Sequence, residues 1–257
     1  VDFCSRPVRA ALEAVDQYVL PLDEWPEVSP ATVHCDDDEW DHVTQKLLDH
    51  GVLTIIKESD IPVIHGKKLG NGAFGVRKTG DAPPGHDYPL RLIANLTPTN
   101  SGQTLIMGDL HKLPLPGEYS QAVLMDDEVA LFSGDDISGC FHLYELPQEW
   151  WKWFVFSKPR RAPAVGGVPR LEYVAVKVIP MGWLSAVGIV QHMHRRIATV
   201  GLKESANLAQ DRELRRDAPF PLRHLAGARW YWSMYVDDSE ETEFVKTEQA
   251  LELIGSV

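Results

Sequence analysis

The chain has 257 residues, of which 44% are hydrophobic and 9% aromatic, and this composition excludes a wholly disordered protein. Its formal charge of −12 argues against nucleic-acid binding, because contacts with phosphates supply most of that affinity. Three scattered cysteines favour a reducing, intracellular compartment (cytoplasm or nucleus), and no apolar run reaches the ~20 residues that span a bilayer.

The first segment, residues 1–60, is acidic, with 14 acidic and four basic side chains. In its first 35 residues, Pro21, Pro26 and Pro30 are spaced through an acidic stretch and predict a loosely organised lead-in. The chain begins at Val1 without a charged and then apolar leader, so we expect a fragment of a longer protein. Acidic residues 36–39 precede apolar residues at helical spacing and predict a helix N-terminus. A weaker alternative is a metal site formed by His34, Cys35, Asp41 and His42.

Short β-type runs follow. Strands are predicted at Val52–Ile56, Val63–Ile64 and Leu90–Leu96, with a hairpin turn at Gly80–His86. The segment Gly70–Gly75 matches the dinucleotide-binding pattern G-x-G-x-x-G. No helix pattern follows it, so a loop at a strand edge is the better interpretation.

The remainder of the chain predicts a largely antiparallel sheet decorated with helices. The expected strands are Glu128–Phe132, Phe141–Leu146, Trp153–Phe156, Tyr173–Ile179 and Trp230–Val236. A helix is expected over Gly182–Val200, and an inserted basic surface helix over Asn207–Arg216. Trp150, Trp151 and Trp153 fit a buried strand pair better than a base-stacking platform.

Two acidic pairs could carry chemistry. Asp135-Asp136 and Asp237-Asp238 each come at the end of an apolar strand. Two strand ends side by side can hold several oxygens around hard cations, and Mg²⁺ prefers carboxylate oxygens together with water and substrate phosphate. One pair alone is more often a surface turn, but two pairs point to a site for two Mg²⁺ ions, with Mn²⁺ as a substitute. His192 and His194 lie two residues apart on the predicted helix and therefore face different sides.

The blocks between Phe74 and Asp238 resemble the fingers and palm of retroelement reverse transcriptases, in the family's order. Asp136 followed five residues later by Phe141 resembles the first palm motif. The stretch 179–183, running on to Gln191, is similar to the Pro-Gln-Gly loop and its helix. Tyr235-Val236-Asp237-Asp238 resembles the Tyr-x-Asp-Asp turn, and residues 74–78 and 91–100 resemble the two fingers strands.

The resemblance implies an α+β right-hand polymerase fold, in which an antiparallel palm sheet is backed by helices. Residues 1–60 would be the acidic lead-in with a helix, 61–115 a fingers-like hairpin region and 116–257 a palm without a thumb. The implied activity is RNA-directed DNA polymerisation, with an RNA or DNA template, a primer and dNTPs as partners and no membrane.

The resemblance also implies a role for each matched residue. Asp136 and Asp237 would be the shared ligands of two Mg²⁺ ions, and Asp238 a weaker third carboxylate. Lys78 and Arg91 would bind the incoming triphosphate. Phe141 would exclude ribonucleotides, and Gly182 would let the backbone approach the nucleotide or the template closely.

Several residues depart from the family pattern. Met181 replaces the loop glutamine, and Asn95 stands where an aspartate is usual. The strand after the Asp-Asp turn is acidic, at Ser239–Glu243, instead of apolar. These departures keep two alternatives open: a catalytically degenerate palm-like domain that acts as a binding module, and a two-metal nuclease.

Overall fold

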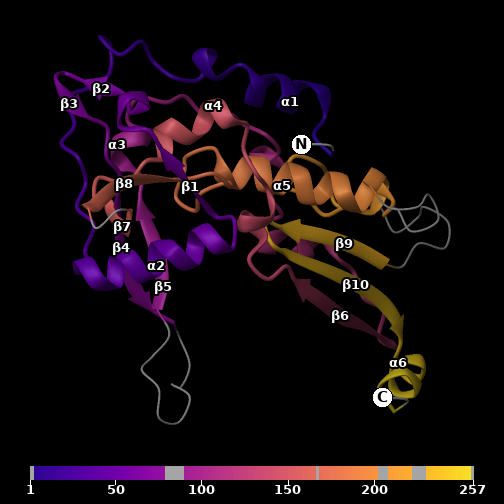
Figure 1. The fold of residues 1–257 in the computed structure, drawn as a ribbon. Coiled ribbons are helices and arrows are strands. Elements are labelled where there is room, and N and C mark those ends of the chain that lie inside the picture. The colour runs from indigo at the N-terminus through magenta and orange to yellow at the C-terminus, as the bar shows by residue number, and fades with distance from the viewer. Residues whose placement is uncertain (1–2, 79–89, 166–167, 202–207, 222–229, 256–257) are drawn as a thin grey trace. The chain divides into compact units, whose positions relative to one another are not determined.

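The computed structural model describes residues 3–78, 90–165, 168–201, 208–221 and 230–255 (Figure 1). The chain divides into two units. Unit 1 comprises Arg6–Ile106 and Phe141–Ala186, and unit 2 comprises Asp2–Ser5, Met107–Cys140 and Val187–Val257. Both units combine helices with small antiparallel sheets, which confirms the α+β class. The division at residues 60 and 115 stays a prediction.

The described strands of unit 1 form three antiparallel sheets. They are β1–β8–β7 (Leu53–Ile56, Val168–Val176, Arg160–Val165), β2–β3 (Val63–Ile64, Lys67–Lys68) and β4–β5 (Gly72–Arg77, Leu90–Asn95). The helices are α1 (Arg6–Glu13), α2 (Asp37–Asp49), α3 (Thr97–Asn100) and α4 (Gln148–Trp151). Helix α2 begins as predicted, because the side chain of Asp36 accepts a hydrogen bond from the Glu39 amide at 2.8 Å.

The core of unit 1 is rich in tryptophan. Residues 6–35 contribute to it and are better ordered than predicted: Trp25 stacks on Trp153 with ring centroids 5.3 Å apart, and the Trp150 indole donates to the Leu12 carbonyl. The predicted strand at Trp153–Phe156 is wrong for its first two residues, while Val155 and Phe156 form isolated β-bridges with Ala175 and Asn71. Trp150 lies in α4 and Trp153 in the following 3₁₀ turn, because the chain turns helical directly after Pro147.

The β4–β5 hairpin contains the glycine-rich segment. Its interpretation as a loop is wrong from Gly72 onward, since these residues lie in β4 and pair antiparallel with β5. A Cβ at Gly72 would come within 2.4 Å of the Thr32 carbonyl oxygen, so close packing of two backbones requires glycine there. The predicted turn at Gly80–His86 lies outside the described residues.

Unit 2 is built on the antiparallel sheet β6–β10–β9 (Glu128–Asp136, Asp238–Lys246, Trp230–Tyr235), with β10 in the middle. Its helices are α5 (Ala186–Arg196) and α6 (Thr247–Gly255), and Figure 1 shows α5 along one face of the sheet. Trp232 and Met234 pack on that face with Ala198, while Tyr231 and Phe244 pack on the other face with Leu214. Strand alternation therefore buries residues on both faces of the sheet.

Several predictions for the palm-like region are corrected. Strand β6 is longer than the predicted Glu128–Phe132 and runs to Asp136, so the two aspartates lie at its end, as expected. Residues Cys140–Leu143 form a 3₁₀ turn where a strand was expected. The expected helix at Asn207–Arg216 is also wrong for its described part, residues 208–216. That part contains one 3₁₀ turn and buries Leu214 against the sheet.

Helix α5 starts at Ala186, later than the predicted Gly182, and continues into a π-helical turn at Ile197–Gly201. Residues 182–185 precede the helix as a turn. Within this turn, the Trp183 indole donates a hydrogen bond to the side chain of Gln103. None of the described helices combines the length and the apolar character needed to cross a membrane.

Candidate metal centre

The three predicted acidic ligands meet at one end of the unit 2 sheet. Asp136 ends β6 and Asp238 begins β10, and these two residues are direct partners in the antiparallel register. Asp237 lies in the two-residue turn that joins β9 to β10. One carboxylate oxygen from each aspartate lies within 4.8 Å of the other two, on side chains that are exposed or half-buried. The donor set consists of oxygen alone, which suits Mg²⁺ or Mn²⁺.

Mutual repulsion acts within this acidic triad (Asp136, Asp237 and Asp238). Partial removal from water raises the pKa of Asp238, and the negative charges of Asp237 and Asp136 raise it further. A bound cation would reverse this effect, because it favours the ionised form of each carboxylate.

The turn that carries Asp237 has an unusual backbone. Val236 has φ of +61°, which β-branched residues rarely adopt and which costs about 1–3 kcal/mol. Its amide donates to Gln191 Oε1 at 2.7 Å, and its carbonyl accepts from His194 Nδ1 at 2.9 Å. Both partners are buried side chains of α5. The strained conformation is therefore held from outside the hairpin.

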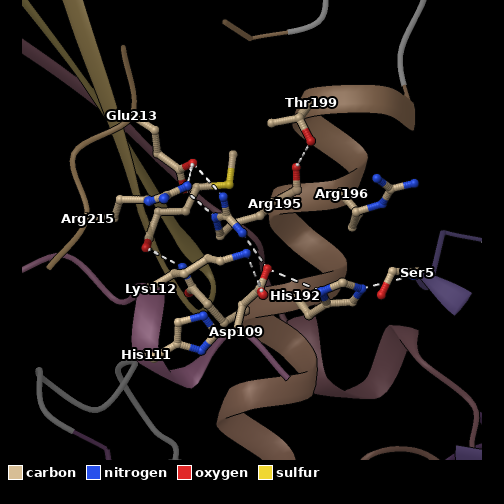
Figure 2. A network of polar contacts seen from close by, with 12 residues as sticks. Ser5, Asp109, His111, Lys112, His192, Arg195, Arg196, Thr199, Glu213 and Arg215 are labelled. Carbon is tan, nitrogen blue, oxygen red and sulfur yellow. Dashed lines mark hydrogen bonds and ion pairs between the residues drawn. The ribbon is translucent and has the colours of Figure 1, made fainter. Parts of the chain in front are cut away.

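Helix α5 is itself fixed by a buried ionic network within unit 2 (Figure 2). Arg195 forms ion pairs with Asp109 and Glu213, and all three side chains are more than nine-tenths buried. His192 Nδ1 lies 3.2 Å from Asp109 Oδ2, while His192 Nε2 accepts from the Ser5 amide. Burial opposes the ionisation of Asp109, yet the hydrogen bond from His192 and the charge of Arg195 hold its pKa well below the usual value.

A hollow of about 660 Å³ adjoins the triad on the same face of the sheet. Asp136 and Asp238 line one part of it, and Tyr119 and Tyr235 are among its aromatic walls. The Tyr119 hydroxyl hydrogen-bonds Glu240 and lies 2.8 Å from Thr242 Oγ1. Burial and the contact with Glu240 raise the pKa of Tyr119 to about 12, so this tyrosine is neutral at physiological pH.

The acidic strand after the turn differs from the family pattern in a way that the sheet accommodates. Glu241 and Glu243 are exposed, because β10 alternates between buried and solvent-facing positions. Glu240 is half-buried and is held by Tyr119. The sheet therefore does not bury any of these three carboxylates in apolar surroundings.

The other four predicted site residues belong to unit 1. Lys78 and Arg91 are exposed on the β4–β5 hairpin, where Val76 pairs with Arg91. Lys78 directly follows Arg77, the last residue of β4. Phe141 lies in the 3₁₀ turn at Cys140–Leu143, and only 8% of its surface is exposed.

Gly182 has φ of +99°, a conformation that favours glycine. The side chain of Asn100 fixes the backbone on both sides of it: its Nδ2 donates to the Gly182 carbonyl, and its Oδ1 accepts from the Leu184 amide. Asn95, one of the departures from the family pattern, accepts from the amide and the hydroxyl of Thr97 at the start of α3.

Sequence reasoning missed the roles of Gln191 and His194. Both lie in the predicted helix, three residues apart, and that spacing puts them on one face. The sequence signal that could have identified them is a pair of polar residues on an otherwise apolar face of the predicted helix. Of the described residues, only the triad forms a group of three or more that could hold a metal, so the alternative site at residues 34–42 receives no support.

Neither a protein-family model nor a curated protein matches this chain.

Proposed function

We propose that the protein is a nucleotidyltransferase of the reverse-transcriptase type, which copies an RNA or DNA template onto a primer with dNTPs. The observation that carries the proposal is the meeting of Asp136, Asp237 and Asp238. Asp136 comes from one block and Asp237 and Asp238 come from another, about a hundred positions later in the chain. The resemblance assigned both blocks to one site. The oxygen-only donor set and the exposure of the triad support binding of Mg²⁺ or Mn²⁺.

Each residue has a chemical role in this proposal. The triad would hold two Mg²⁺ ions, which supply the positive charge that activates a primer 3′-hydroxyl and stabilises the departing pyrophosphate. Lys78 offers a compact ammonium to the outer phosphates, and Arg91 a planar fork for bidentate contact. Phe141 would disfavour a 2′-hydroxyl, and Gly182 would let the backbone approach the nucleotide or the template.

Primer extension tests the proposal. The full 257-residue chain is incubated with a primed RNA template, dNTPs and Mg²⁺, and the products are separated by length. We expect wild-type protein to extend the primer and Asp237→Asn to abolish extension. Asp126→Asn is the matched control, because Asp126 is an exposed aspartate of unit 2 that lies outside both the triad and the hollow beside it. Equal extension by wild type and Asp237→Asn contradicts the proposal.

The second candidate is a palm-like binding module without catalysis. The observation that favours it is the charge beside the triad: Glu240, Glu241 and Glu243 follow within one strand and repel phosphates. A wild-type protein that is folded but neither extends nor binds the primed template would support this candidate in the form of a module that binds another protein. The two-metal nuclease is separated from both by its products, since cleavage shortens the labelled strand and extension lengthens it.

A further inference from the structure

The β9–β10 hairpin lacks the local sequence that normally stabilises its turn. Two-residue hairpin turns need positive φ and therefore favour Asn-Gly or Asp-Gly. Here the turn residues are Val236 and Asp237, and Val236 has φ of +61°. A β-branched residue does not choose this conformation by itself, so another part of unit 2 must hold it.

Two side chains of α5 take both backbone groups of Val236. The Val236 amide donates to Gln191 Oε1 at 2.7 Å, and the His194 ring donates to the Val236 carbonyl at 2.9 Å. Gln191 also donates to the Met234 carbonyl at 2.8 Å, so that it bridges the end of β9 and the turn. Gln191 is fully buried, which leaves no water to replace these bonds.

The turn is also tied to the segment that follows Asp136. The Asp237 carbonyl accepts from the Ile137 amide at 3.0 Å. A shift of the turn would therefore change the spacing between Asp237 and Asp136. The helix that provides the reference is rigidly placed, because Arg195 on α5 pairs with Asp109 and Glu213, and the Asp109 amide donates to the Gly188 carbonyl (Figure 2).

We infer that Gln191 and His194 are positioning residues that hold the Val236 backbone in its strained conformation and thereby direct the carboxylates of Asp237 and Asp238 toward one cation shared with Asp136. The inference rests on the proposed cation site. Residues that orient metal ligands without touching the metal typically change its affinity 10–100-fold when they are replaced.

The test measures two quantities on the full chain. Binding of Mn²⁺ is followed by the electron paramagnetic resonance signal of free Mn²⁺, and hydrogen exchange of the Ile137 amide reports on the turn without any metal. The variants are Gln191→Met, His194→Phe and His194→Asn, which keeps a donor near the position of Nδ1. Thr199→Val is the matched control, because Thr199 is buried after α5 and bonds only the Arg195 carbonyl in the contacts described.

We expect Gln191→Met and His194→Phe to weaken Mn²⁺ binding about tenfold or more and to speed exchange at Ile137. His194→Asn should stay within about twofold of wild type, and Thr199→Val should lower the melting temperature without changing Mn²⁺ affinity. Adding Val236→Gly to Gln191→Met should recover much of the affinity, because glycine adopts positive φ without help.

Unchanged Mn²⁺ affinity and unchanged Ile137 exchange in both Gln191→Met and His194→Phe overturn the inference. Absence of recovery in the double variant overturns the claim that the two side chains act through the Val236 backbone. If Gln191→Met does not fold, the test rests on His194. Equal Mn²⁺ affinity and equal Ile137 exchange in His194→Phe and His194→Asn would then overturn the inference. If wild type binds no more Mn²⁺ than Asp237→Asn, the proposed cation site fails, and Ile137 exchange alone then decides whether α5 holds the turn.

Discussion

Asp136, the last residue of β6, pairs directly with Asp238, the first residue of β10, in the antiparallel register of the unit 2 sheet. Like charges in directly opposed strand positions destabilise a sheet. This pair therefore costs the metal-free protein a small amount of stability, and a bound cation would remove that cost.

Replacing one of the two charges should stabilise the metal-free protein. We expect Asp238→Asn to raise the free energy of unfolding by about 0.3 kcal/mol, a small value because solvent screens both side chains. Added Mn²⁺ should raise the melting temperature of wild type more than that of the variant. Thermal unfolding with EDTA and with Mn²⁺ measures both effects. A variant less stable than wild type in EDTA contradicts this explanation.

Arg91 should contribute to binding of the incoming nucleotide. We expect Arg91→Ala to raise KM for dNTP about tenfold while kcat changes little, because the contact stabilises bound substrate and transition state alike. Steady-state primer extension measures both constants. Arg77→Ala is the control, since Arg77 pairs with Leu90 and strand alternation puts it on the other face of the hairpin. An equal rise of KM in Arg91→Ala and Arg77→Ala would indicate that the loss of positive charge in general, and not the loss of a specific Arg91 contact, weakens dNTP binding.

The buried network around α5 predicts acid sensitivity. Asp109 has a pKa in the folded protein well below its unfolded value, so its contribution to stability is fully present above about pH 4. This contribution is lost as the pH falls through the folded value. We expect Asp109→Asn to cost about 2 kcal/mol at pH 7, because Arg195 keeps Glu213 but loses its second buried carboxylate, and Lys112 and His192 lose a charged partner. The gap to wild type should narrow toward pH 3.

Urea unfolding at pH 7, 5 and 3 measures this dependence, with Asp126→Asn as the exposed control. A constant difference between wild type and Asp109→Asn across that range contradicts the assignment.

Cys35 should be an unreactive thiol despite its partial exposure. Burial raises the pKa of Cys35 to about 11, and the hydrogen bond that its Sγ donates to Glu39 and the Glu39 charge act in the same direction. We expect slow alkylation by iodoacetamide at pH 8, faster in Glu39→Gln by about tenfold for each unit by which the pKa falls. Glu27→Gln is the control. Rates that are equal in wild type and Glu39→Gln would rule out this explanation.

Residue order and local pattern predicted much of the fold. The cap at Asp36, the paired strands β4 and β5 and the aromatic strand before Asp237 follow from signals that act within a few residues. The tryptophan segment at Trp150 was misassigned, because β-propensity reflects packing that only the folded chain provides.

A carboxylate site was predicted because both acidic pairs end apolar strands, and the resemblance selected Asp136 over Asp135. The direct pairing of Asp136 with Asp238 was not predicted, because strand register depends on contacts between segments that are distant in the sequence. The strained Val236 and its partners on α5 were missed for the same reason: local sequence disfavours that backbone, and only tertiary hydrogen bonds hold it.

Anomalous X-ray diffraction from crystals grown with Mn²⁺ tests most directly whether Asp136, Asp237 and Asp238 bind a divalent cation. We predict an anomalous peak about 2.0–2.3 Å from carboxylate oxygens of at least two of the three residues, and its absence in Asp237→Asn crystals. Wild-type crystals without a peak there, or with Mn²⁺ bound only at other carboxylates, would contradict the account.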